Sequence, residues 1–187
     1  DPSDGFAERS GLPTMAVLLQ QMVIPRASGM LFTVDPVTGM TDEMMIEAAP
    51  GFGEALAEGR IHPDLFRVRR QGDEPRALRI AERAVAPKDR HLVPFPLGSG
   101  ELVFEPLPAE KRSSPSLTDD EILVLCRLGL RIERQLGGPM DIEWAIAEGC
   151  DPVVLQARPV TGLPASSLRQ PRREALRRRP VLWTQRF

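Results

Sequence analysis

The stretch PMDIEWAIAEGCDPVVLQARPV, residues 139–160, shows the clearest β-hairpin pattern in this chain. Two runs of alternating residues flank residues 148–151, and four-residue loops are common connections between antiparallel strands. If Ala147 opposes Pro152, the numbers of any two paired residues add up to 299. This pairing predicts the face on which every side chain lies, because successive residues of a strand point to opposite faces.

The predicted pairing gives the hairpin one apolar face and one polar face. The apolar face is expected to contain Ile142, Trp144, Ile146, Val153, Leu155 and Ala157. On the polar face Glu143 opposes Gln156, and Asp141 opposes Arg158. Directly opposed residues have Cβ atoms roughly 4.5–5.5 Å apart, so these four polar side chains are expected to share one small patch.

The polar patch has the chemistry of a site for Mg²⁺ and a polyphosphate. The Glu143 carboxylate and the Gln156 amide offer hard oxygen ligands, which Mg²⁺ prefers together with water and phosphate oxygens. The planar guanidinium of Arg158 suits bidentate contact with a phosphate. Two alternatives stay open: the polar face of a hairpin often only contacts water, and a one-residue slip would place Gln156 and Arg158 on the apolar side.

The rest of the chain predicts an α+β fold with a mixed or antiparallel sheet and few helices. Short apolar runs predict strands at residues 15–23, 29–34, 44–48, 65–70 and 77–85. A short helix is expected at 54–58. Residues 86–116 are rich in Pro, Gly and Ser, so we expect a surface loop there with one short apolar segment at 101–104.

The longest helix is expected to begin after Thr118. Thr118 and Glu121 have the spacing of a capping box, and Leu117 and Ile122 have the spacing of a hydrophobic staple across it. Gly137 and the Gly-Pro pair that follows predict its end. Its buried face is predicted to contain Ile122, Leu125, Cys126, Ile132 and Leu136.

The composition restricts the class of protein. With 187 residues, 42% hydrophobic and 27% charged, the chain is typical of a globular domain. A net charge of −2 argues against a dedicated nucleic-acid-binding protein, and no apolar run reaches the roughly 18 residues of a membrane span. No secretory signal is visible, and Cys126 and Cys150 form no CxxC pair, so a reduced, cytoplasmic protein is the simpler interpretation.

Five segments together resemble a known family. They are, in chain order, MAVLLQQMV (15–23), SGMLFTVDPVTG (28–39), PGFGEALAEGRIHPD (50–64), DIEW (141–144) and LQARP (155–159). In this order they resemble the second half of the nucleotide-binding domain of phosphoenolpyruvate synthase, pyruvate phosphate dikinase and rifampin phosphotransferase, which are phosphotransferases with an ATP-grasp fold. The resemblance covers about residues 12–164. It implies a partial ATP-grasp domain at 1–164 and a basic interdomain linker at 165–187.

The resemblance implies ATP and Mg²⁺ as cofactors, and it gives the polar hairpin residues roles. Glu143 and Gln156 would help to hold Mg²⁺ and phosphate. Arg158 would contact the phosphates as the catalytic residue of this half. The family's aromatic-Gly-Leu-Gly-Glu string is replaced here by PGFGE at 50–54, which keeps both glycines.

The segment 15–23 resembles the family's strand at the adenine of the nucleotide. Gln20 would then lie at the nucleotide, and Met22 and Val23 would line the adenine slot. For Met22 and Val23, packing in the core is an equally good interpretation, because an apolar strand residue is usually buried. The family's lysine between the glutamine and the methionine is Gln21 here, which removes a charge.

Family members carry parts that this sequence does not match. A first ATP-grasp half supplies a lysine, an arginine and a glycine-rich loop to the triphosphate, and another domain carries the phosphorylated histidine. The resemblance implies these parts as partners, together with a small-molecule acceptor such as pyruvate, and neither nucleic acid nor membrane. We expect this chain to be a fragment that transfers no phosphate alone. Its polar hairpin face and the segment around Gln20 are expected to face open solvent or a neighbouring molecule.

Two other functions stay open. The ending RPVTGLP, residues 158–164, is slightly closer to the rifampin phosphotransferases, whose acceptor is a drug hydroxyl. A half of an ATP-grasp domain is also compatible with a non-catalytic module that binds a nucleotide weakly or docks onto a partner domain.

Overall fold

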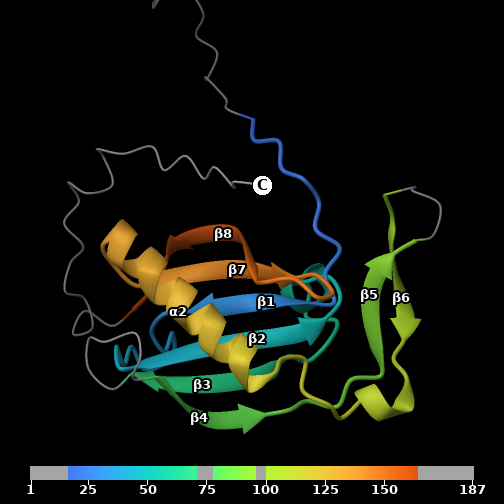
Figure 1. Ribbon diagram of the computed structural model, residues 1–187, viewed down its shortest axis with the longest axis horizontal. Coiled ribbons are helices and arrows are strands. Elements are labelled where there is room, and N and C mark those ends of the chain that lie inside the picture. Colours follow the sequence, from blue (N-terminus) through green and yellow to red (C-terminus); the bar gives the residue numbers. More distant parts are fainter. Residues whose placement is uncertain (1–16, 71–77, 96–99, 164–187) are drawn as a thin grey trace, which may run out of the picture.

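The computed structural model describes residues 17–70, 78–95 and 100–163. Within these residues an antiparallel sheet has the strand order β4-β3-β2-β1-β7-β8 (Figure 1). Its strands are β1 (Ala27–Phe32), β2 (Glu43–Pro50), β3 (Asp64–Arg70), β4 (Leu78–Ala84), β7 (Met140–Ile146) and β8 (Val153–Pro159). The other elements are α1 (Glu54–Ala57), β5 (Arg90–Pro94), β6 (Leu102–Pro106), the 3₁₀ turn η1 (Ala109–Lys111) and α2 (Asp119–Leu136). The predicted α+β class is confirmed.

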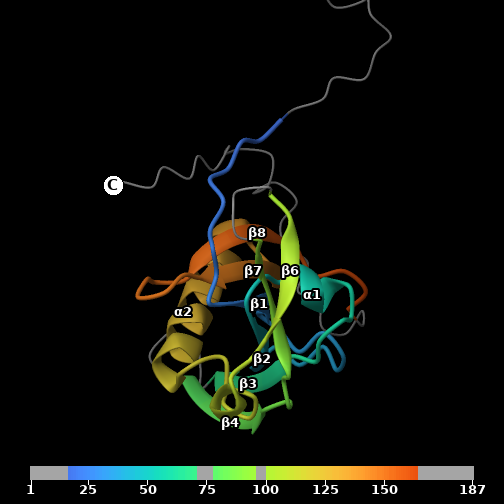
Figure 2. The ribbon, with the colours of Figure 1, turned by 90° about the vertical axis from the view of Figure 1, so that its right-hand side faces the viewer.

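The helix α2 covers one face of the sheet (Figure 2). Its predicted capping box is present: Thr118 Oγ1 accepts from the Glu121 N–H at 3.3 Å, and the Glu121 carboxylate accepts from the Thr118 N–H at 2.9 Å. The helix ends at Gly137, which has a left-handed φ of 81°. No helix in the described part of the chain is long and apolar enough to cross a membrane.

The hydrophobic core lies between α2 and the sheet. Trp144 and Phe66 are fully buried there, as is Cys126, the cysteine that the sequence placed on the buried helix face. Burial raises the pKa of the Cys126 thiol to about 12, so it packs as a small apolar group. An added Cβ at Gly129 would lie 2.6 Å from Leu31 Cδ2, so the missing side chain lets α2 approach β1 closely.

The strand predicted at 15–23 is wrong for the residues that the structure describes. Residues 17–25 are extended but pair with no strand of the described chain, and most of their apolar side chains are exposed, Leu19 to 93%. Figure 1 shows this segment running away from the sheet before β1. An apolar run gives the propensity for a strand, but it cannot supply the neighbouring strand that completes the hydrogen bonds.

The surface loop predicted at 86–116 is wrong in part, because it contains the β5–β6 hairpin. Each strand has only five residues, so the Pro, Gly and Ser residues around them dominate the composition. Leu92 of β5 is buried, and its carbonyl oxygen accepts from the Phe52 N–H at 2.9 Å. This contact fastens the hairpin to the loop that follows β2.

The predicted register of the β7–β8 hairpin is correct at its open end and shifted near its turn. Glu143 opposes Gln156 as expected, but a β-bulge follows and Trp144 opposes Val154 in place of Leu155. Val154 therefore packs against the core, whereas Leu155 is 38% exposed. The β3–β4 pair has a similar irregularity between Arg67 and Val68.

Candidate functional site

The face of the sheet opposite α2 carries the predicted Mg²⁺ site. Across four neighbouring strands, Glu47 of β2 opposes Met30 of β1, Met30 opposes Glu143 of β7, and Glu143 opposes Gln156 of β8. Residues that oppose one another share a face, so these side chains form one row. The next row contains Asp141 and Arg158, which also oppose one another.

The pairing of Glu143 with Gln156 is the arrangement that the sequence predicted. The Glu143 side chain is half-buried and that of Gln156 is exposed. Neither side chain makes a hydrogen bond or ion pair within the described residues. Both sets of oxygens are therefore open to a ligand from solvent.

Arg158 lies against Asp141 and extends into solvent. Its Nε and Nη2 atoms each lie 2.8 Å from Asp141 Oδ2, and the Arg158 side chain is 60% exposed. The other carboxylate oxygen, Asp141 Oδ1, is buried and has no partner within the described residues. An unsatisfied buried acceptor of this kind costs roughly 1–3 kcal/mol, which a water, a cation or another donor at this point would offset.

Glu47 adds a third carboxylate to this face. It is half-buried and makes no hydrogen bond or ion pair within the described residues. Burial raises the pKa of its carboxyl group, and the negative charge of Asp141 raises it further. We call Glu47, Asp141, Glu143, Gln156 and Arg158 the open cluster, because its acidic groups outnumber its single arginine and several of its atoms lack partners.

The open cluster fits a hydrated Mg²⁺ better than a fully protein-bound metal. No group of three or more His, Cys, Asp and Glu residues converges on one metal position in the part of the chain that the structure describes. Mg²⁺ commonly takes one or two carboxylates from a protein and completes its coordination with water and phosphate oxygens. The orphaned Asp141 Oδ1 is an acceptor that a bound cation or a water would satisfy.

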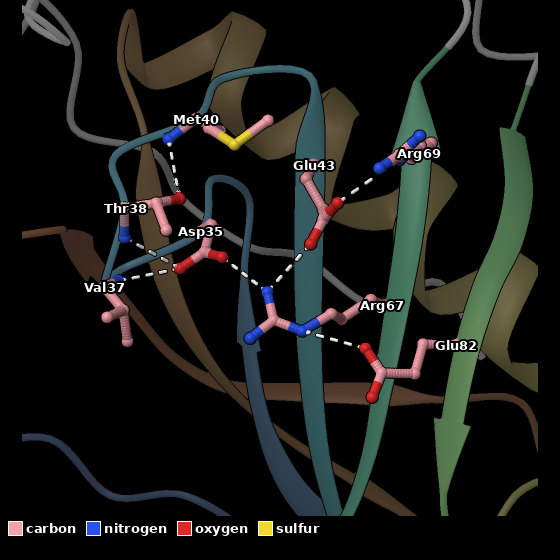
Figure 3. Close-up of polar contacts among 8 residues, drawn as sticks. All are labelled: Asp35, Val37, Thr38, Met40, Glu43, Arg67, Arg69 and Glu82. Carbon is pink, nitrogen blue, oxygen red and sulfur yellow. Dashed lines mark hydrogen bonds and ion pairs between the residues drawn. The ribbon is translucent and has the colours of Figure 1, made fainter.

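In a second group of charges, farther along the same face, every residue has at least one ion-pair partner (Figure 3). Arg67 Nη1 lies 2.5 Å from Asp35 Oδ2 and 2.8 Å from Glu43 Oε1, and Arg67 Nε lies 3.3 Å from Glu82. Asp35 Oδ1 also accepts from the N–H groups of the two residues 37 and 38. We call Asp35, Glu43, Arg67, Arg69 and Glu82 the closed cluster.

The closed cluster holds the loop between β1 and β2. Burial alone would raise the pKa of Asp35, but the hydrogen bonds from Arg67 and from the Thr38 and Val37 N–H groups outweigh it, and the net pKa lies below its ordinary value. Arg67 also donates to Glu43, and its hydrogen bonds to Glu43 and to Asp35 raise its pKa. The two carboxylates and the guanidinium bind one another, which indicates that the closed cluster has a structural role.

The structure places the other predicted nucleotide residues apart from the open cluster. Gln20 is exposed, Met22 is 68% exposed and Val23 is half-buried, all on the extended segment 17–25. The alternative that Met22 packs in the core is therefore wrong for the described structure. The expectation of open solvent is confirmed for Gln20, Gln156 and Arg158. It is wrong for Asp141, which is buried, and Glu143 is only half-buried.

Two residues of the open cluster were not predicted as site residues. Asp141 was placed in the polar patch by the hairpin register, but nothing in the sequence showed that one of its oxygens is orphaned. Glu47 lies in a strand that was predicted at 44–48. Only the sheet order, with β1 between β2 and β7, brings it to the same face as Glu143.

Comparison with known families identifies the fold and the domain. Residues 8–178 match the family described as pyruvate phosphate dikinase, AMP/ATP-binding domain. This chain belongs to that family. The resemblance inferred from the five sequence segments is confirmed, and the chain is part of an ATP/AMP-binding domain of a phosphotransferase family.

Its relatives include both kinds of enzyme that the sequence suggested. The chain is 40% identical over 149 residues to a rifampicin phosphotransferase of Streptomyces sviceus, covering 80% of this chain and 16% of that protein. It is 37% identical to a rifampicin phosphotransferase of Bacillus subtilis, with the same coverage. It is 36% identical to a probable phosphoenolpyruvate synthase of Methanocaldococcus jannaschii, covering 80% of this chain and 12% of that protein. The chain thus spans less than a fifth of the length of these three relatives.

Proposed function

We propose that this chain is the half of an ATP-binding domain that holds Mg²⁺ and the phosphates in a phosphoenolpyruvate synthase-like phosphotransferase. The complete enzyme would pass a phosphoryl group from ATP to a histidine on its own mobile domain and then to pyruvate. The observation that carries the proposal is the pairing of Glu143 with Gln156 beside Arg158, on an open face of a chain from an ATP-binding family.

In this proposal each polar side chain has one task. Glu143 and Gln156 contribute the protein's oxygen ligands to Mg²⁺, which when bound neutralises charge on the phosphates. Arg158 offers a planar guanidinium to a phosphate, and its hydrogen bond to Asp141 fixes the orientation of that guanidinium. These contacts position the phosphates and balance charge, which is the general requirement of phosphoryl transfer.

The first half of the ATP-grasp domain is proposed as the partner of segment 17–25. The apolar side chains at 17, 18, 19, 22 and 24 are exposed, and the segment forms no backbone hydrogen bonds within the described residues. An extended segment of this kind offers both unpaired backbone groups and apolar side chains to another part of the enzyme. A nucleotide would then lie between that half and the open cluster.

The test compares this chain with the whole protein that contains it. The whole protein, incubated with ATP and Mg²⁺, is expected to become phosphorylated on histidine, whereas the purified chain is not. In the whole protein, Glu143→Gln should lower turnover on the order of 10²–10³-fold, as loss of a preorganised charge contact does. Glu82→Gln, an exposed carboxylate of the closed cluster, is the matched control and should change turnover less than about twofold.

The same experiment separates the alternative functions. Transfer to pyruvate supports the synthase. Transfer to a rifamycin hydroxyl with no transfer to pyruvate supports the rifampicin phosphotransferase type, and the relatives of the chain include both kinds of enzyme. If the whole protein is not phosphorylated at all, the proposal fails and a non-catalytic nucleotide-binding or docking module remains.

A further inference from the structure

We propose that Arg26 is a positioning residue for the nucleotide. It would act by setting the direction in which the adenine-binding segment 17–25 leaves the sheet. The inference rests on the proposed function and on the expectation, implied by the family resemblance, that Gln20, Met22 and Val23 lie at the nucleotide. No feature of the sequence pattern singled out Arg26.

Arg26 uses its backbone and its side chain to bind three separate parts of the molecule. Its N–H donates to the Ile146 carbonyl at 2.9 Å, and its carbonyl accepts from the Gly51 N–H at 3.0 Å. Its guanidinium donates from Nη1 to the Ser116 carbonyl at 3.1 Å and from Nη2 to the Glu121 carboxylate. The position and orientation of this residue are therefore fixed from several sides.

Both side-chain acceptors of Arg26 are themselves held in place. Glu121 is the capping-box residue of α2, and its second oxygen accepts from the Thr118 N–H. The N–H and hydroxyl of Ser116 each donate to Asp64 Oδ2 at 2.7 Å. Asp64 is fully buried and pairs through Oδ1 with Lys88 Nζ at 2.5 Å. The guanidinium thus meets two fixed acceptors.

The residues before Arg26 lack comparable contacts. Within the described residues, positions 17–25 make no backbone hydrogen bond, and Pro25 is the single fully buried side chain among them. Proline restricts its own φ to about −65°. Pro25 directly precedes Arg26, so the backbone has little freedom where segment 17–25 joins Arg26. A change in the orientation of Arg26 would be transmitted to Val23, Met22 and Gln20.

A purely structural role for Arg26 makes a different prediction, and the chain offers a matched control. Arg83 of β4 also binds the first turn of α2, through Asp119 at 2.7 and 3.1 Å. It lies on the strand at the far edge of the sheet and has no contact with segment 17–25. If arginine–carboxylate pairs at this helix end only support α2, the two arginines should be interchangeable in their effects.

The experiment measures kcat, KM for ATP and the melting temperature of the whole enzyme with Arg26→Ala, Glu121→Gln or Arg83→Ala. Misplacement of a positioning element by about 1 Å can cost up to 100-fold, so we expect Arg26→Ala to raise KM for ATP roughly 10-fold. The adenine is remote from the reacting phosphate, so kcat should stay within about twofold. Glu121→Gln keeps a capping box, which accepts Glu or Gln, but removes the charge that Arg26 binds; it should raise KM less. Arg83→Ala should leave both constants unchanged.

The outcomes separate this inference from the proposed function. An unchanged KM in Arg26→Ala, or an equal rise in Arg83→Ala, overturns the positioning role while the phosphotransferase proposal stands. If Arg26→Ala does not fold, the rise in KM for ATP in the folded Glu121→Gln enzyme decides the question in the same way. A wild-type enzyme without ATP-dependent turnover overturns both proposals.

Discussion

Two clusters of charged side chains lie on the same face of the sheet, and they differ in how completely their atoms are bonded. In the closed cluster, Arg67 pairs with Asp35, Glu43 and Glu82. In the open cluster, Asp141 Oδ1 has no partner, and Glu47 and Glu143 are unpaired within the described residues. The closed cluster stabilises the fold by itself, whereas the open cluster leaves a buried oxygen free at a cost that a water, a cation or another donor would offset.

The largest expected effect tests whether the open cluster lies on the face assigned to it. Trp144 is adjacent to Glu143 but lies fully buried under α2. Trp144→Ala should lower the free energy of unfolding by about 3–5 kcal/mol through a core cavity, measured by urea denaturation of this chain. Leu155→Ala, at the residue that the bulge exposes, should cost only about 0.5 kcal/mol. Equal losses of unfolding free energy in the two variants would mean that Leu155 is buried like Trp144 and that the β-bulge is wrong.

The next effect compares one substitution in both clusters. Arg158→Lys keeps a positive charge beside Asp141 but loses the planar fork, so turnover of the whole enzyme should fall on the order of 100-fold with little change in melting temperature. Arg67→Lys should lower the melting temperature, because Arg67 uses two separate nitrogens, Nη1 for Asp35 and Glu43 and Nε for Glu82, and a single ammonium nitrogen cannot occupy both positions. Turnover of the folded enzyme should stay nearly unchanged. The reverse pattern would contradict the division into open and closed clusters.

A pH series addresses the closed cluster. The pKa of Asp35 is lowered in the folded protein, so its contribution is fully present above the unfolded pKa, near 3.9, and is lost as the pH falls through the folded pKa. Asp35→Asn should therefore lose about 1.5–3 kcal/mol at pH 7, since hydrogen bonds to a charged group are worth that much. When the pH is lowered from 5, the free energy of unfolding of Asp35→Asn should fall less than that of the wild type. If the free energies of unfolding of the two proteins fall equally as the pH is lowered, protonation of Asp35 does not contribute to the loss of stability in acid.

The smallest expected effect has the opposite sign. The pKa of Glu47 is raised, by burial first and then by Asp141, so keeping it ionised at pH 7 costs stability. Glu47→Gln should stabilise this chain by roughly 0.5–1 kcal/mol at pH 7, and the gain should disappear below the ordinary carboxyl pKa of about 4.3. Glu105→Gln, in the separate β5–β6 hairpin, serves as the control for removing a negative charge. Destabilisation by Glu47→Gln would mean that this carboxylate has a partner.

The sequence predicted the part of the site that depends on local pairing. The alternation along 139–160 was enough to oppose Glu143 with Gln156, but the expected pair Ala147–Pro152 does not form, because β7 ends at Ile146 and β8 begins at Val153. The bulge could not be predicted, because Val153, Val154 and Leu155 are all apolar and each would suit the core. The capping box of α2 was likewise predictable, since its two residues lie three positions apart.

The rest of the site depends on contacts between distant segments. Glu47 reaches the open cluster only because β1 pairs with both β2 and β7, an order that no local pattern specifies. The contacts of Arg26 with Ser116 and Glu121 span about 90 positions of sequence. A strand was predicted at 15–23 from its apolar residues, but residues 17–25 pair with no strand among the described residues. A local apolar pattern does not show whether a neighbouring strand is present.

The irregular pairings at both outer strands have a consequence for how the sheet grows. Each edge strand, β4 and β8, pairs with its inner neighbour through a shifted register. Such bulges bend an edge and interrupt the even row of donors and acceptors on which an additional strand would form. Lateral addition of a seventh strand, from another molecule or from the rest of the enzyme, is therefore disfavoured at either side. The two bulged edges therefore protect the sheet from edge-to-edge aggregation.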